Sequence, residues 1–203
     1  MPSLTDEIFS QLSRADVQQI SSQLGTGQAQ TAGAIAAALP MILGAMGRNA
    51  SQPEGADALF GALGRDHNAG GGIADILGAV LGGQQSRQTD GLGQLGHIFG
   101  GQLPRAEAGL GEATGLGNSQ VQKLLSILAP IVMAYLAKQM FGGQQQASPH
   151  VLGQVLGQER QVQQQQGGLG GGLLGAVLDQ DGDGQLGLGD LLKVGMGAMR
   201  GRS

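Results

Sequence analysis

Two long apolar stretches, each with a proline near its middle, constrain the fold of this chain more than any other feature. The first is AGAIAAALPMILGAM, at residues 32–46, and the second is LLSILAPIVMAYLA, at residues 124–137. Each is shorter than the ~20 apolar residues that a membrane-spanning helix requires. A proline inside a helix also removes one backbone hydrogen bond. We therefore expect two buried core helices, kinked or broken at Pro40 and Pro130, and no membrane span.

The two stretches belong to an internal repeat. A shift of 90 residues aligns three pairs without a gap: Gly25 with Gly115, Gln30 with Gln120, and Pro40 with Pro130. Self-similarity of this kind predicts two related helical halves. We assign residues 1–81 to the first half and 92–158 to the second, with a Gly- and Gln-rich linker at 82–91. A second linker at 159–172 then leads to a helix-loop-helix tail at 173–203.

The sequence around these stretches is also helical. Apolar residues recur every three or four positions through residues 4–24, which is the spacing of one helix face. Ser13 is placed to cap a helix that Gly25 ends, and Thr26 and Asn118 are expected to cap the two long apolar helices. No stretch alternates β-branched and polar residues as a strand does. We predict an all-α fold.

The composition excludes several kinds of function. The chain has no Cys, which excludes disulfides and thiolate metal sites. Its net charge is -4, and its eleven Lys and Arg are spread singly, so nucleic-acid binding is not expected. The first ten residues carry Asp6 and Glu7 instead of the basic residues of a signal peptide, which predicts a cytoplasmic protein.

The glycine content bears on how the protein is stabilised. The chain contains 40 Gly, no Trp and one Tyr, so its core must be built largely from small side chains. Small side chains bury little apolar area each. We therefore expect modest stability and help from an ion or a partner subunit, which predicts a homo-oligomer or a complex with another protein.

The stretch DQDGDGQLGLGD, at residues 179–190, gathers four aspartates in a chain that is only 13% charged. An EF-hand loop takes oxygen ligands at positions 1, 3, 5, 7, 9 and 12 and requires glycine at position 6. Gly184 stands at the sixth position. The predicted ligands are the side chains of Asp179, Asp181, Asp183 and Asp190 and the backbone carbonyl of Gln185. We predict a single divalent-cation site that takes Ca²⁺, with Mg²⁺ as the alternative ion.

Two features predict that this site is weak. Asp190 is one methylene shorter than the usual glutamate, as in dockerin-type loops. The first half has no matching acidic loop, so EF-hand pairing within the chain is not expected. A lone loop of this kind binds Ca²⁺ with a dissociation constant of ~10⁻⁵ to 10⁻³ M. The alternative interpretation is a flexible acidic turn, since DGDG is itself a turn sequence.

No stretch of the sequence indicates catalysis. GLGQLG, at residues 91–96, matches a dinucleotide-binding pattern only formally, because no strand precedes it. His67, His97 and His150 are far apart in the sequence, and no serine has the surroundings of a nucleophile elbow. We therefore predict a non-catalytic protein.

Four features together resemble a known bacterial family. They are an N-terminal helical region, TGLGNSQVQKLLSILAPIVMAYLAKQ at residues 114–139, the Gly/Gln linker, and the terminal LLGAVLDQDGDG…DLL. The chain resembles the YidB-like proteins, a family of unknown function. The resemblance implies a small helical, homeodomain-like fold, and with it the alternative function of a DNA-associated regulator. From the residues themselves we favour a self-associating helical protein with one cation site.

Overall fold

The structure is a computed structural model of the 203-residue chain and describes residues 3–67, 73–84, 89–142 and 147–165. The chain divides into two compact units, Met1–Arg160 and Gln161–Ser203. Of the second unit, only residues 161–165 are described, and they form the end of the last helix. All regular structure in the described ranges is helical, which confirms the all-α prediction.

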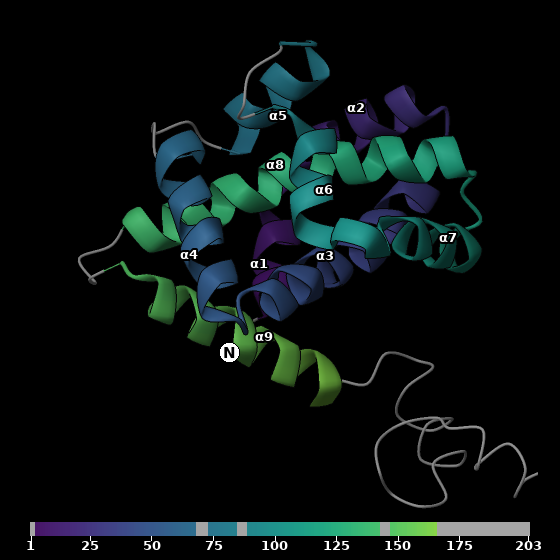
Figure 1. The fold of residues 1–203 in the computed structure, drawn as a ribbon. Coiled ribbons are helices and arrows are strands. Elements are labelled where there is room, and N and C mark those ends of the chain that lie inside the picture. The colour runs from purple at the N-terminus through teal and green to yellow at the C-terminus, as the bar shows by residue number, and fades with distance from the viewer. Residues whose placement is uncertain (1–2, 68–72, 85–88, 143–146, 166–203) are drawn as a thin grey trace, which may run out of the picture. The chain divides into compact units, whose positions relative to one another are not determined.

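The helices follow one another with short connections (Figure 1). In chain order they are α1 (Leu4–Gln11), α2 (Arg14–Leu24), α3 (Gln28–Asn49), α4 (Pro53–Ala62), the π-helix η1 (Leu63–His67), α5 (Ile73–Leu81), α6 (Gly91–Phe99), the 3₁₀-helix η2 (Gly100–Gln102), α7 (Leu103–Thr114), α8 (Asn118–Phe141) and α9 (Pro149–Gln165). The last helix extends into the segment at 159–172 that we expected to be a linker.

The repeat recurs in the local geometry of two helix pairs, α2–α3 and α7–α8. Gly25 and Gly115 end the first helix of each pair in the left-handed conformation, with φ of 67° and 70°. Glycine takes this conformation without steric cost. The second helix of each pair then starts after another glycine, Gly27 or Gly117. Equivalent positions in the two halves therefore fold in the same way, and both predicted halves lie within the first unit.

The two halves also exchange equivalent hydrogen bonds. Gln30 of α3 donates from Nε2 to the carbonyl of Thr114, at 3.2 Å. Gln120 of α8 donates from Nε2 to the carbonyl of Leu24, at 2.9 Å. The donors are 90 residues apart, and so are the acceptors. Each half thus caps the end of a helix in the other, as in the isologous interface of a two-fold dimer.

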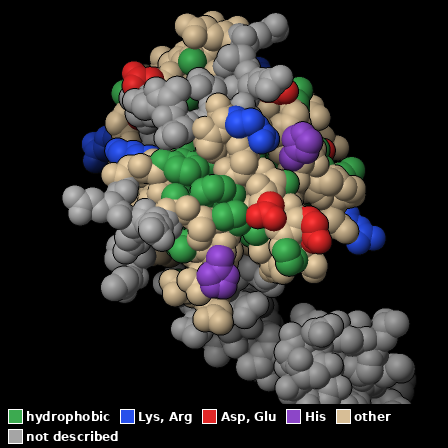
Figure 2. Space-filling view, turned by 60° about the vertical axis from the view of Figure 1, so that its left-hand side comes forward, with side chains coloured by type: hydrophobic (Ala, Val, Ile, Leu, Met, Phe, Trp, Pro, Cys, Tyr) green, Lys and Arg blue, Asp and Glu red, His purple; other side chains and the backbone are tan. Residues whose placement is uncertain are grey.

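The core is built around α3 and α8. Figure 1 shows α8 running through the middle of the first unit, where it contacts α3, α5, α6 and α7. Most of its residues from Val121 to Met140 are buried, as expected for a helix that is apolar on all sides. Figure 2 shows that apolar side chains also reach one face of the molecule, where basic, acidic and histidine side chains surround them.

By length and composition, α3 and α8 could each cross a membrane. Other parts of the structure bury 50% of the most apolar window of α3 and 78% of that of α8. Both helices continue through their prolines, so of the two alternatives, a kink or a break into shorter helices, the break is wrong.

One packing contact lies beside the proline of α8. Pro130 has no N–H with which to bond the carbonyl of Ser126, four residues earlier. The start of α6 lies against this carbonyl, because Gly91 has no side chain. A Cβ at Gly91 would overlap the backbone C and O atoms of Ser126. The glycine thus allows α6 to pack directly on the backbone of α8.

Candidate functional sites

The predicted cation ligands fall outside the described residues. They are Asp179, Asp181, Asp183, Gln185 and Asp190. Their arrangement therefore stays a prediction. Across the described ranges, no group of three or more His, Cys, Asp or Glu side chains is arranged to hold a metal ion.

The three histidines lie on different elements: His67 in η1, His97 in α6 and His150 in α9. Each of the last two lines a cavity of its own. His150 is also hydrogen-bonded to Gln154, with 3.1 Å between its Nε2 and the amide nitrogen. The structure does not bring His97 and His150 into a shared site.

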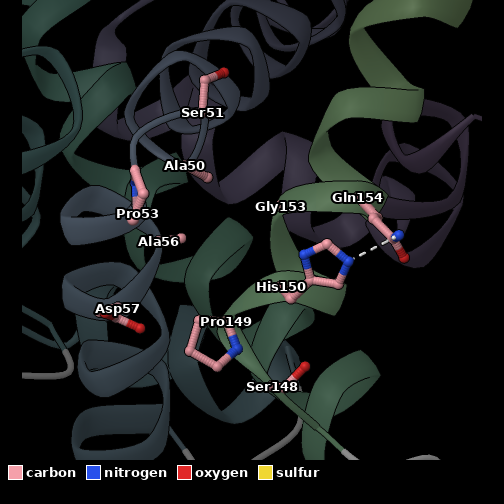
Figure 3. A pocket seen from close by; sticks show the side chains of 10 residues that line it. All are labelled: Ala50, Ser51, Pro53, Ala56, Asp57, Ser148, Pro149, His150, Gly153 and Gln154. Carbon is pink, nitrogen blue, oxygen red and sulfur yellow. Dashed lines mark hydrogen bonds between the residues drawn. The ribbon is translucent and has the colours of Figure 1, made fainter.

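The cavity beside His150 lies between the α3–α4 connection and the start of α9 (Figure 3). Its volume is about 560 Å³. The residues that line it are Ala50, Ser51, Pro53, Ala56, Asp57, Ser148, Pro149, His150, Gly153 and Gln154. Several of these carry hydroxyl, carboxyl or imidazole groups, which are the groups that catalytic sites use.

Two hydroxyl groups of this cavity, those of Ser51 and Ser148, bond backbone groups at the ends of helices. Ser51 donates from Oγ to the carbonyl of Gly47, at 2.7 Å. Ser148 accepts at Oγ from the amide of Val151, at 3.3 Å, so it caps α9. A serine nucleophile needs a base within hydrogen-bond reach. The hydrogen bonds described for both hydroxyls are to backbone groups, and they give the cavity no catalytic assignment.

A buried carboxylate joins the two ends of the first unit. Glu159 of α9 is only 4% exposed. Its carboxylate accepts from the amides of Leu4 and Thr5, at 2.8 and 3.2 Å, and from the Thr5 hydroxyl, at 2.8 Å. The first amides of a helix lack partners within that helix, and its N-terminus attracts negative charge. Glu159 therefore stabilises the start of α1 from 155 residues away.

The remaining amides in the first turn of α1 are satisfied locally. Ser3 accepts at Oγ from the amide of Asp6, at 3.1 Å, and its carbonyl accepts from the amide of Glu7, at 3.0 Å. Asp6 reaches back to the amide of Ser3, which completes a capping box. The N-terminus of α1 is thus occupied by side chains of this chain and offers no anion site.

A second polar cluster joins α1 to α8. The hydroxyl of Tyr135 donates to the carboxylate of Glu7. Gln139 donates from Nε2 to the Tyr135 oxygen, at 2.7 Å, and to the Glu7 carboxylate, at 3.2 Å. Burial, followed by the hydrogen bond to Glu7, raises the pKa of Tyr135 to about 12. The neutral phenol is therefore part of the folded state.

This shift can be measured directly, because the chain has one Tyr and no Trp. We expect tyrosinate absorbance to titrate with a midpoint near 12 in the folded protein, against about 10 in urea. Because the folded pKa is the higher one, the contribution of Tyr135 to stability is complete below pH ~10 and is lost as the pH rises through the folded pKa. Glu7→Gln should lower the midpoint, whereas Glu112→Gln, on the exposed side of α7, should not. A folded midpoint at ~10 would contradict this account.

The chain matches one known protein family over much of its length. The family described as "Bacterial protein of unknown function (DUF937)" matches residues 6–139, which is more than half of the chain. No curated protein and no solved structure matches the chain. The match ends within α8 and leaves out α9.

Proposed function

The chain belongs to this bacterial family of unknown function, and we propose that it is a non-catalytic helical protein whose tail binds a divalent cation. The observation that carries the proposal is the spacing of aspartates in residues 179–190, which fits the ligand positions of an EF-hand loop. The proposed ligands are the side chains of Asp179, Asp181, Asp183 and Asp190 and the carbonyl of Gln185. A closer relationship to the YidB-like proteins is part of the same proposal.

The physical reason is the repulsion between the clustered carboxylates. Four like charges within twelve residues oppose any compact loop, and a divalent cation removes this penalty while it gives the oxygen ligands a common centre. We propose Ca²⁺ as the ion, with Mg²⁺ as the alternative. Binding of the ion and ordering of the loop would then be coupled.

We propose further that the protein works in the cytoplasm, through a second copy of itself or a protein partner. The support is the composition, because a core of small side chains benefits from extra buried area at a subunit interface. Size-exclusion chromatography with light scattering, with and without Ca²⁺, tests this part. A mass above 20.4 kDa per particle supports self-association, and a monomer under both conditions rejects it.

The cation site has its own test. We expect millimolar Ca²⁺ to release heat in calorimetry and to raise the Tm of the full chain. Asp179→Asn combined with Asp181→Asn should abolish both effects, because it removes two of the proposed ligands. The control, Asp57→Asn combined with Glu112→Gln, makes the same change in charge on exposed helix surfaces and should retain them. Absence of both effects in the natural protein rejects the site.

A further inference from the structure

A second cavity, distinct from the one beside His150, combines a basic rim with an apolar floor. It has a volume of about 590 Å³, within the range of small-molecule sites. The residues that line it are Met46, Arg48, Asn49, Gln52, Gly55, Ala58, Leu59, Ala62, Arg65, Gln94, His97, Ile98 and Met133. They come from α3, the α3–α4 connection, α4, η1, α6 and α8.

The floor of this cavity is apolar and adaptable. Met46 is fully buried, Met133 is 4% exposed, and Ile98 is 5% exposed. Methionine side chains are flexible and polarisable, so they adjust to ligands of different shape. No aromatic side chain is among the described residues of the lining, so the floor suits an aliphatic group better than a ring that needs stacking.

The rim is positive in a chain that is negative overall. Arg48, Arg65 and His97 line the cavity and no Asp or Glu of the described chain does, whereas the net charge of the chain is -4. All three basic side chains are exposed. Arg48 lies in the last turn of α3, where the helix dipole favours a cation. His97 lies in the last turn of α6. Arg65 lies in η1, a π-helical turn of the kind frequent at functional sites.

One side chain holds the walls of the cavity together. Asn49 donates from Nδ2 to the carbonyls of His97 and Ile98, at 3.0 and 2.8 Å. These bonds tie the end of α3 to the end of α6 and satisfy two carbonyls that the last turn of α6 leaves open. The carbonyls of His97 and Ile98 are thus engaged by Asn49.

Among the residues that the structure describes, Arg48 and Arg65 have no partner of opposite charge. No hydrogen bond or ion pair to either guanidinium occurs within the described part of the chain. A guanidinium binds a carboxylate through two parallel hydrogen bonds. From the apolar floor, the cationic rim and the volume, we propose that this cavity binds an amphipathic carboxylate, with its head at Arg48 and Arg65 and its aliphatic tail over Met46 and Met133.

Decanoate is a suitable probe, because it carries one carboxylate on an unbranched tail. We expect calorimetry with the full chain to show binding of decanoate, and weaker binding of decanol and of decyltrimethylammonium. Arg48→Gln combined with Arg65→Gln should weaken decanoate roughly tenfold or more, the loss of about one charge-assisted contact. The matched control, Arg14→Gln combined with Arg105→Gln, removes the same charge from exposed positions outside the cavity and should leave the affinity unchanged.

A variant that fills the cavity tests decanoate binding without a change of charge. Ala58→Leu fills part of the cavity from an exposed position on α4 and should also weaken decanoate. Its Tm reports whether the variant is folded. The proposal is overturned if decanoate does not bind the natural chain, if decanol binds equally well, or if the double arginine variant binds like its control. The cavity lies in the first unit, so failure of the cation site in the tail leaves this result unaffected.

Discussion

Gly91→Ala is expected to lower the free energy of unfolding by roughly 1–3 kcal/mol, the range for overpacking a well-filled core. The added Cβ would overlap the backbone C and O atoms of Ser126, and a backbone cannot yield as the end of a flexible side chain can. Relief requires α6 to move away from α8, which exposes the buried side chains of Leu95 and Ile98. Urea denaturation followed by circular dichroism measures the effect.

The same helix offers a matched control. Gly96 lies in α6, is exposed, and would have no atom within 4 Å of an added Cβ. Gly96→Ala should therefore raise stability, by up to about 1 kcal/mol, because alanine is the better helix former. The two substitutions are chemically identical and opposite in expected sign. If Gly91→Ala were as stable as Gly96→Ala, the direct contact between α6 and the backbone of α8 would not exist in solution.

The helices could be predicted because their signals are local. The apolar period and the caps of α2, Ser13 and Gly25, depend on residues within a few positions, and the structure confirms both caps. Thr26 and Asn118 were wrong as caps, since α3 and α8 start after Gly27 and Gly117. Competing contacts explain Thr26, whose hydroxyl pairs with that of Thr31. At α8, the N-cap residue is Gly117, and its amide donates to Oε1 of Gln120.

The structure shows a consequence of the repeat that the sequence could not predict, namely hydrogen bonds between the two halves. An offset of 90 residues predicted related halves, but it could not predict that Gln30 and Gln120 bond across to the opposite half. That exchange depends on how the halves pack, which a one-dimensional alignment does not contain. The exchange of hydrogen bonds also explains why glutamine recurs at positions 30 and 120. A helix alone would accept many other polar residues there, but the bonds between the halves need a side-chain donor.

The cavities and the buried carboxylate could not be predicted for a related reason. Arg48, Arg65 and His97 are isolated in the sequence, and only the packing of α3, η1 and α6 gathers them around one cavity. Glu159 stands at the edge of a Gln-rich stretch, and no local signal separates it from a solvated charge. The cation site of the tail, in contrast, can be predicted from the sequence, because all of its proposed ligands lie within the twelve residues 179–190.

The position of α9 links these observations to stability. The family match ends at residue 139, yet the core of the first unit includes Leu152 and Leu156, which are fully buried. Glu159 follows them one turn later and bonds the start of α1. The matched region therefore does not contain the whole folded unit, and α9 is needed to close it.

Glu159→Ala tests this role and should lower the free energy of unfolding by about 3 kcal/mol, since it leaves the part-buried amides of Leu4 and Thr5 without a charged acceptor. Glu159→Gln keeps an acceptor oxygen and should cost less, because the charge at the helix N-terminus is lost while part of the hydrogen bonding remains. Glu112→Ala, at an exposed position of α7, should change stability little. Hydrogen exchange adds a local measurement, because the amides of Leu4 and Thr5 should lose protection in Glu159→Ala before the rest of the core does. Equal stability of Glu159→Ala and Glu112→Ala would mean that the Glu159 carboxylate does not hold the start of α1, and the buried Leu152 and Leu156 would then attach α9 to the core without it.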